Sequence, residues 1–348
     1  MWRKPMSRKR ICQWPFCYNA PMTSPPSRQI IVSGIQPSGE LHIGNYLGAI
    51  KNWLTLQDDP KYRCFFFIAD LHSLTADFDP HTKYQQIIGL ARDLIALGLD
   101  PKKCTLFVQS EIPEHTELSW IFSTLTPMSE LERMTQYKDK SAHQITNVNV
   151  GLFTYPVLQA ADILMYKAGR VPVGEDQVQH VELTRVLARK FNNKFSDTFP
   201  ETLPLLTETP RVMSLTEPLK KMSKSHGPKS FIALADPPEI ILEKIRKATA
   251  DEVGVKNLLE LHHLFDGNGA ATQEFLGEHE RGTLMNVKLK DALAALIANH
   301  FAYFRAERVK ISESSVLKIL KAGVKTASAI AQETMREVRM KVGIRAGA

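Results

Sequence analysis

Residues 30–45 read IIVSGIQPSGELHIGN, and this stretch decides the fold. Its first residues, Ile30 to Val32, form an apolar run with the length of a short buried strand. A turn rich in Gly, Pro and Ser follows over residues 34–39, and apolar residues at helical spacing begin near Asn45. A strand that leads through such a turn into a helix predicts the carboxyl edge of an open parallel sheet, where sheets of this kind bind ligands.

The alternation of strands and helices continues along the chain. Further apolar strands are predicted at residues 64–69, 105–108 and 171–173. Between the first two of these, residues 84–97 carry apolar side chains at helical spacing. The pattern predicts an α/β fold, with a doubly wound parallel sheet that helices cover on both faces.

The character of the sequence changes after a Lys/Ser cluster at residues 220–225. From there it shows helical stretches and almost no strand signal, and residues 236–239 (DPPE) predict a helix start with a capping box and proline in the first turn. We therefore expect three parts: a disordered basic tail over 1–28, an α/β domain over 29–230 and a helical domain over 231–348.

The net charge of +7 comes mostly from the first 28 residues, which hold six basic residues and no acidic one. The rest of the chain is nearly neutral, with 38 basic and 37 acidic residues. Residues 301–348, however, carry ten Lys and Arg against four Asp and Glu. This local excess favours a polyanionic partner, although a solvated helical face gives the same count.

No apolar run is long enough to span a bilayer, so we expect no membrane partner. The four cysteines are too few and too scattered for a disulfide framework or a Cys-x-x-Cys metal site, which favours a reducing compartment such as the cytoplasm. The tail also has the composition of a mitochondrial transit peptide, but prolines interrupt any amphipathic helix in it. We expect a bacterial N-terminus, with the mitochondrial matrix as the alternative.

Two common nucleotide motifs, Gly-x-Gly-x-x-Gly and Gly-x-x-x-x-Gly-Lys-Ser/Thr, are absent from the sequence. A first candidate in their place is His42-Ile43-Gly44-Asn45, near the expected start of the first helix. A helix N-terminus offers free N–H groups to phosphates, and Gly44 lets a nucleotide approach the backbone. His42 and Asn45 can donate hydrogen bonds. An ordinary glycine turn with a surface histidine explains the same four residues equally well.

A second candidate is Lys221-Met222-Ser223-Lys224-Ser225. Two lysines that flank a serine, on a loop of small residues, make a cationic clamp that can stabilise negative charge on a departing pyrophosphate. A solvated basic linker is the usual alternative for a short run of this kind.

Together and in this order, the two motifs resemble the HIGH and KMSKS signatures of the class I aminoacyl-tRNA synthetases, and the His-Ile-Gly-Asn form is similar to that of the tryptophan enzymes. The further segments that resemble this family are 33–39, 131–138, 154–164 and 171–177. The resemblance extends from about residue 30 to near the end of the chain. It implies a Rossmann-like, nucleotide-binding catalytic domain over 29–230 and a helical tRNA- or anticodon-binding domain over 231–348.

The resemblance also implies the residues that act on ATP. The implied catalytic residues are His42, Asn45, Lys221 and Lys224. Asp176 is suited to the ribose hydroxyls, and Lys138 and Lys140 are further candidates for the phosphates, although a surface helix would show the same lysines. The full set implied for ATP is Gln36, Pro37, Ser38, Gly44, Asn45, Gly174, Glu175, Asp176, Val212, Lys221, Met222, Ser223, Lys224 and Ser225.

For the tryptophan pocket the resemblance implies Asp162, Tyr155, Gln177 and His72. Asp162 would accept the indole N–H, which is the only polar group of the substrate side chain. Its alternative role is that of a helix-cap carboxylate. For His72 and Tyr155, a satisfied core residue is an equally good interpretation.

The implied reaction requires no general base and no metal site in the protein, because the carboxylate of tryptophan is already an anion and Mg²⁺ travels with ATP. The implied partners are L-tryptophan, tRNA(Trp) and a second copy of the chain in a homodimer. Three alternatives stay open: a tyrosine-specific synthetase, a small nucleotidylyltransferase and a non-enzymatic RNA-binding paralogue. Asp162 and the 171–177 segment favour tryptophan, and the intact lysines favour an enzyme.

Overall fold

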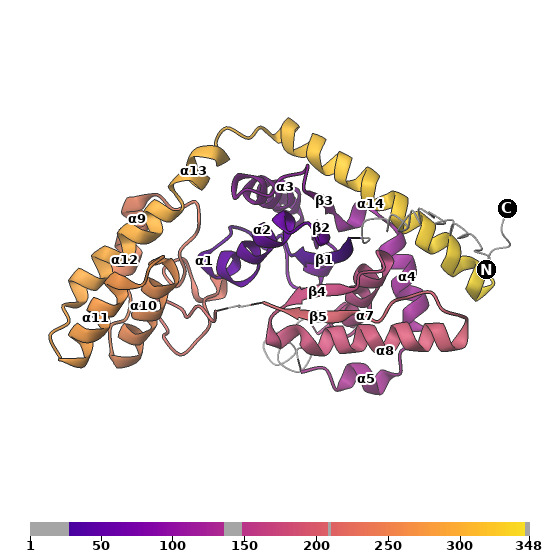
Figure 1. Ribbon diagram of the computed structural model, residues 1–348, viewed down its shortest axis with the longest axis horizontal. Coiled ribbons are helices and arrows are strands. Elements are labelled where there is room, and N and C mark those ends of the chain that lie inside the picture. Colours follow the sequence, from indigo (N-terminus) through magenta and orange to yellow (C-terminus); the bar gives the residue numbers. More distant parts are fainter. Residues whose placement is uncertain (1–27, 136–147, 208–209, 345–348) are drawn as a thin grey trace, which may run out of the picture.

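The computed structural model describes residues 28–135, 148–207 and 210–344 (Figure 1). The tail predicted over 1–28 lies outside these ranges except for its last residue. Lys138 and Lys140 also lie outside them.

A five-stranded parallel sheet forms the centre of the molecule, with strand order β3-β2-β1-β4-β5. The strands are β1 (Gln29–Ile35), β2 (Tyr62–Ile68), β3 (Cys104–Val108), β4 (Arg170–Val173) and β5 (Leu203–Leu206). The chain moves outward from β1 to one edge and then returns to its other side at β4. A crevice forms at such a switch point, outside the carboxyl ends of the strands.

Helices cover both faces of this sheet, which confirms the predicted doubly wound fold (Figure 1). The helices of the sheet domain are α1 (Ile43–Asn45), a π-helix (Tyr46–Ile50), α2 (Lys51–Asp58), α3 (Pro80–Ala96), α4 (Glu114–Ser123), α5 (Met128–Glu132), α7 (Val150–Met165) and α8 (Val178–Lys194). Side chains of successive strand residues enter opposite cores. Ile31 and Phe66 pack in the core that α2 and α3 share, and Val32 and Phe65 pack in the core that α4, α7 and α8 share.

A group of shorter helices follows the sheet domain: α9 (Pro238–Arg246), α10 (Glu252–Phe265), α11 (Ala270–Glu280), α12 (Asn286–His300) and α13 (Ala302–Arg308). The predicted proline in the first turn of α9 is confirmed, but the predicted capping box is wrong. Pro237 is the N-cap, and the Asp236 carboxylate instead accepts a hydrogen bond from the backbone N–H of Ala233 (2.9 Å) and pairs with Lys244 (2.6 Å).

The last helix, α14 (Glu313–Val342), returns from this group and packs on β3, α3, α4 and α7 (Figure 1). The approach is close: a Cβ atom on Gly323 would lie 1.8 Å from the backbone carbonyl oxygen of Leu106 in β3. Within the predicted range 231–348, α14 therefore packs with the sheet, apart from α9 to α12. In the described ranges, no helix combines the length and the apolarity needed to cross a membrane.

Candidate active site

A cavity of about 1280 Å³ opens at the switch point between β1 and β4. Four segments of the chain line it, within residues 32–53, 159–163, 171–177 and 207–222, together with Phe67 from the end of β2. Both signature motifs contribute residues to this cavity. It therefore brings together parts of the chain that lie up to 190 positions apart.

His42 and Asn45 cap the first helix reciprocally. The backbone N–H of Gly44 donates to Nδ1 of His42 (3.1 Å), and the backbone N–H of His42 donates to Oδ1 of Asn45 (3.1 Å). Each side chain thereby satisfies a backbone donor that would otherwise lack a partner. The predicted helix start is therefore built by the motif itself, at the carboxyl end of β1.

The imidazole of His42 is neutral near pH 7. Burial, together with the charges of Lys224 and Lys221, lowers the pKa of His42 to about 4. Because Nδ1 accepts the hydrogen bond from Gly44, the neutral ring carries its proton on Nε2. His42 thus keeps an N–H donor in a cavity where a cation would be repelled by two lysines.

A short hairpin holds the second motif opposite this helix. The backbone N–H of Ser214 donates to the carbonyl of Lys220 (2.8 Å), and the backbone N–H of Met222 donates to the carbonyl of Val212 (2.9 Å). These bonds define the hairpin 212–222. Lys221, Met222 and Val212 all line the cavity.

Lys224 lies just past this hairpin and docks on the first loop. Its ammonium donates to the carbonyl oxygens of Ser38 (2.7 Å) and Glu40 (3.0 Å) and to Oγ of Ser38 (3.3 Å). An ammonium has three donors, so protein oxygens occupy all of them here. Burial lowers the pKa of Lys224. In this arrangement the two motifs contact each other directly.

Asp162, on α7, also lines the cavity, and it is 1% exposed. Its carboxylate contacts Nε2 of His72 (2.7 Å) and Nδ1 of His115 (2.6 Å), and it accepts from Nε2 of Gln109 at both oxygens (2.8 and 2.9 Å). Burial by itself raises the pKa of Asp162, but the hydrogen bonds from His115 and His72 outweigh burial and lower it. Asp162 is therefore an ionised carboxylate with three donors around it.

The structure sorts the predicted site residues into two groups. Those that line the cavity are His42, Gly44, Asn45, Asp162, Gly174, Glu175, Asp176, Gln177, Val212, Lys221 and Met222. Those that do not line it are Gln36, Pro37, Ser38, Ser223, Lys224, Ser225, His72 and Tyr155. In the second group, the ammonium of Lys224 donates a hydrogen bond to the carbonyl of Ser38, and Nε2 of His72 contacts the carboxylate of Asp162. Tyr155 is a buried residue whose hydroxyl contacts Nε2 of His180 (3.0 Å).

Sequence reasoning missed two partners of Asp162. Gln109 and His115 are both completely buried, and Nε2 of His115 contacts the hydroxyl of Tyr166 (2.8 Å). A weak signal existed for Gln109, because it directly follows the apolar strand that ends at Val108. Nothing in the sequence near His115 marks it as a partner of a carboxylate 47 positions away.

Gln159 and Arg211 also line the cavity and were not predicted. Gln159 lies one helical turn before Asp162 on α7, so that both face the same end of the cavity. Arg211 directly precedes the hairpin 212–222 in the chain.

Comparison with known proteins agrees with this geometry. The model of the family "tRNA synthetases class I (W and Y)" matches residues 25–302. A Caldanaerobacter subterraneus protein named tryptophan–tRNA ligase is 46% identical over 329 residues, which covers 90% of this chain and 98% of the relative. A Clostridium tetani protein of the same name is 42% identical, with coverage of 91% and 96%.

Solved structures show the same relationship. Tryptophanyl-tRNA synthetase from Mycoplasma pneumoniae aligns with a TM-score of 0.79 at 37% identity, covering 91% of this chain and 98% of that one. The Campylobacter jejuni enzyme, solved with ADP and tryptophan, aligns with a TM-score of 0.78 at 35% identity, covering 90% and 99%. The match over most of the chain, on a cavity that joins both signature motifs, shows that this chain belongs to the class I tRNA synthetase family for tryptophan and tyrosine.

Proposed function

We propose that this chain is a tryptophan–tRNA ligase, which activates L-tryptophan with ATP and transfers it to tRNA(Trp). One observation carries the proposal: a single cavity joins the capped His42–Asn45 helix start, the lysine hairpin and the buried carboxylate of Asp162. The names of the two curated relatives and of the two solved structures, all tryptophan enzymes, support the same amino acid.

In the first step, an oxygen of the tryptophan carboxylate attacks the α-phosphorus of ATP. The new P–O bond gives tryptophanyl-adenylate, and the bond to the bridging oxygen breaks so that pyrophosphate leaves with its electrons. The backbone N–H groups at the start of α1 already have partners in the protein, so Nε2–H of His42 is the donor here that can bind a phosphate oxygen. Lys221 adds positive charge where the pyrophosphate departs. Mg²⁺ would enter with the phosphates of ATP.

Lys224 takes part only after it leaves the oxygens of Ser38 and Glu40. In the present arrangement its three donors are occupied, so it has none to offer a phosphate. If the loop 223–225 moves toward the pyrophosphate, Lys224 exchanges its hydrogen bonds to neutral carbonyl and hydroxyl oxygens for contacts with charged phosphate oxygens. The adenylation step therefore couples to a rearrangement of the second motif.

We assign the ribose to the turn after β4, where Gly174 leads into Glu175 and Asp176 at the cavity wall. We assign the indole to the end that Asp162 and Phe67 line. The amide of Gln109 bridges both oxygens of Asp162, so a shift of this amide to one oxygen would leave the other able to accept the indole N–H. Gln177 lines the wall between the two ends and would contact the amino group of the substrate.

In the second step a hydroxyl of the terminal ribose of tRNA attacks the aminoacyl carbonyl and AMP leaves. The helices α9 to α13 and the exposed lysines of α14 provide surfaces for the tRNA. Lys318, Lys321 and Lys325 lie one turn apart on the exposed face of α14 and form no ion pair within the described ranges. Phosphate groups are the natural partners of such a stripe.

A homodimer and a cytoplasmic location complete the proposal. Trp120 on α4 is 73% exposed and Met128 on α5 is 63% exposed, and large apolar side chains of this kind are enriched in the centres of interfaces. Cys64 and Cys104 are free thiols on neighbouring strands, which suits a reducing compartment.

Pyrophosphate exchange into ATP, measured with each of the twenty amino acids, tests the proposed activity. We expect exchange with tryptophan and very little with tyrosine or phenylalanine. Charging of tRNA(Trp) transcript with labelled tryptophan then tests the second step. Exchange that depends on tyrosine would identify the enzyme as the other member of the family, and no exchange with any amino acid would exclude a synthetase.

A further inference from the structure

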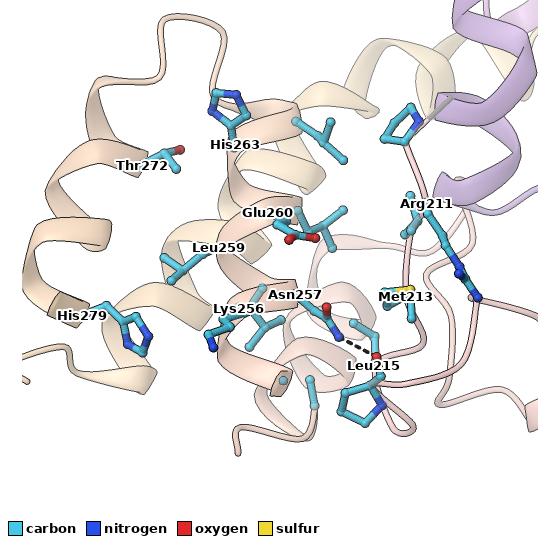
Figure 2. Close-up of a pocket in the computed structure, with 18 of the residues that line it drawn as sticks. Arg211, Met213, Leu215, Lys256, Asn257, Leu259, Glu260, His263, Thr272 and His279 are labelled. Carbon is cyan, nitrogen blue, oxygen red and sulfur yellow. Dashed lines mark hydrogen bonds between the residues drawn. The ribbon is translucent and has the colours of Figure 1, made fainter. Parts of the chain in front are cut away.

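A second cavity, of about 620 Å³, lies behind the hairpin that carries the lysine motif (Figure 2). One wall consists of residues 210–215 and Pro218, and the rest of the lining comes from α10, α11 and residues 248–249 just before α10. Met213 and Leu215 lie on the hairpin side, and Leu259 lies on α10 (Figure 2). Such a volume, with a mainly apolar lining and a few polar groups, is typical of sites for small molecules.

The wall of this cavity is shared with the active site. Pro210, Arg211 and Val212 line both cavities. Val212 accepts a hydrogen bond from the backbone of Met222, and Met213 pairs with Lys221 across the hairpin. A molecule in the second cavity would therefore contact the first strand of the hairpin, at residues 212–213. The second strand of the same hairpin carries Lys221.

The charges around the cavity favour a cation. Glu260 lies on α10 among the residues that line the cavity (Figure 2), and this exposed side chain has no ion pair or hydrogen bond among the described residues. Glu280 adds a second carboxylate at the rim, whereas the ammonium of Lys256 is already paired with Glu252 (2.9 Å). Among the lining residues, Arg211 and Lys256 formally balance Glu260 and Glu280, but Glu252, which pairs with Lys256, brings the local charge to minus one.

We infer that this cavity is a regulatory binding site for a compact apolar amine, and that its occupation slows adenylate formation. The amine's hydrocarbon body would fill the space between Met213 and Leu276, and its ammonium would pair with Glu260. A ligand that binds the present arrangement stabilises it against rearrangement. In this arrangement Lys224 is docked on Ser38 and Glu40, so the ligand would delay the release of Lys224 toward the pyrophosphate.

Binding is tested first, without reference to activity. The probe is 1-adamantylmethylamine, a saturated cage that cannot imitate indole, and adamantane-1-carboxylate is its matched anion. With methyl-¹³C-methionine in the full chain, we expect the amine to shift the Met213 resonance saturably and the anion to bind more weakly. Glu260→Gln should weaken amine binding about three- to fivefold, as for a partly exposed ion pair. Leu276→Trp, which fills the cavity, should abolish the shift.

The coupling is tested by kinetics and rests on the proposed function. The amine should lower the maximal rate of tryptophan-dependent exchange without raising the Michaelis constant for tryptophan, and Leu276→Trp should be insensitive to it. No saturable Met213 shift, a shift that persists in Leu276→Trp, or inhibition competitive with tryptophan would each overturn the inference. If the wild type exchanges no amino acid, the proposed function fails, and the Met222 resonance then decides the coupling: an unchanged Met222 signal under amine saturation overturns it.

Discussion

Nδ1 of His115 lies 2.6 Å from Oδ1 of Asp162, and the two residues are almost completely shielded from solvent. The other ring nitrogen of His115 contacts the hydroxyl of Tyr166 at 2.8 Å. A buried carboxylate is tolerated only when donors surround it, and His115 is one of three donors here. This pair therefore fixes both the charge and the position of the acidic group that lines the cavity.

Replacing His115 with phenylalanine keeps a ring in place but removes a donor from Asp162. We expect a loss of about 1.5–3 kcal/mol in the free energy of unfolding, the usual magnitude for a hydrogen bond to a charged group. Urea unfolding measures the change. The exposed His81→Phe serves as the control and should stay within about 0.5 kcal/mol of the wild type. Equal stability of His115→Phe and the wild type would show that the pair contributes nothing.

Lys224→Ala should slow adenylate formation by roughly 2.7–4 kcal/mol in activation free energy, by analogy with the loss of one transition-state donor. The affinity for tryptophan should barely change, because the charge that Lys224 stabilises develops only in the transition state. Single-turnover adenylation and tryptophan binding separate the two effects. The control is Lys220→Ala, since Lys220 pairs with Glu217 on the exposed side of the hairpin. A normal turnover rate with a raised Michaelis constant for ATP would mean that Lys224 only binds ATP.

The lowered pKa of His42 makes stability depend on pH. Above the unfolded pKa of 6.5 the ring is neutral in both states, so it contributes no pH dependence. As the pH falls from 6.5 toward 4, His42 becomes protonated in the unfolded chain but stays neutral in the folded protein. The free energy of unfolding therefore falls by up to about 3 kcal/mol. His42→Gln should remove this part of the loss, which urea unfolding at pH 7 and pH 4.5 measures. Parallel pH profiles for the two proteins would contradict the assignment.

Gly323→Ala should destabilise the protein by at least about 1–3 kcal/mol, because the new Cβ would meet the Leu106 carbonyl at 1.8 Å and push α14 away from β3. Gly89→Ala, on α3, is the matched control. Nothing lies within 4 Å of its added Cβ, so we expect a gain of about 0.5–1 kcal/mol from helix propensity. Thermal unfolding of both variants decides whether α14 packs on the sheet as described.

The sequence predicted the parts of the fold that local patterns determine, and it missed the parts that depend on contacts between residues far apart in the chain. The strands at 30–32, 64–69, 105–108 and 171–173 are continuous apolar runs, and the structure confirms a strand at each. β5 was missed although Leu203–Leu206 is as long as β4 and each contains one proline, because a glycine turn and a helical pattern follow β4 and mark it, whereas no such pattern follows β5. The folding back of α14 was also missed, because only its small residue at position 323, matched to a distant carbonyl, reveals it.

The candidate site likewise has parts that the local sequence predicts and parts that it does not. The capped helix start and the lysine hairpin are each formed by one short segment, so their residue order predicted them, and the structure places both at one cavity. The three partners of Asp162 come from three separate elements, and no local pattern links Gln109 or His115 to it. The placement of His72 and Tyr155 in direct contact with substrate stays a prediction, because neither lines the cavity in this structure.

The sharpest prediction concerns how Asp162 selects its substrate. Burial of an aromatic ring supplies binding affinity, but it discriminates poorly between indole and other large rings. A buried charged acceptor discriminates better, because a substrate without a matching donor leaves the acceptor desolvated and unpaired. Asp162→Ala should therefore lower the preference for tryptophan over an analogue with sulfur in place of the indole N–H by roughly ten- to hundredfold, equivalent to about 1.5–3 kcal/mol. Competitive pyrophosphate exchange measures the ratio. His115→Phe disturbs the same network but keeps the carboxylate, so it should lower activity on both substrates and leave their ratio intact. If Asp162→Ala also leaves the ratio intact, the carboxylate only positions its neighbours, and another group, of which Gln159 is the nearest in the chain, accepts the indole N–H.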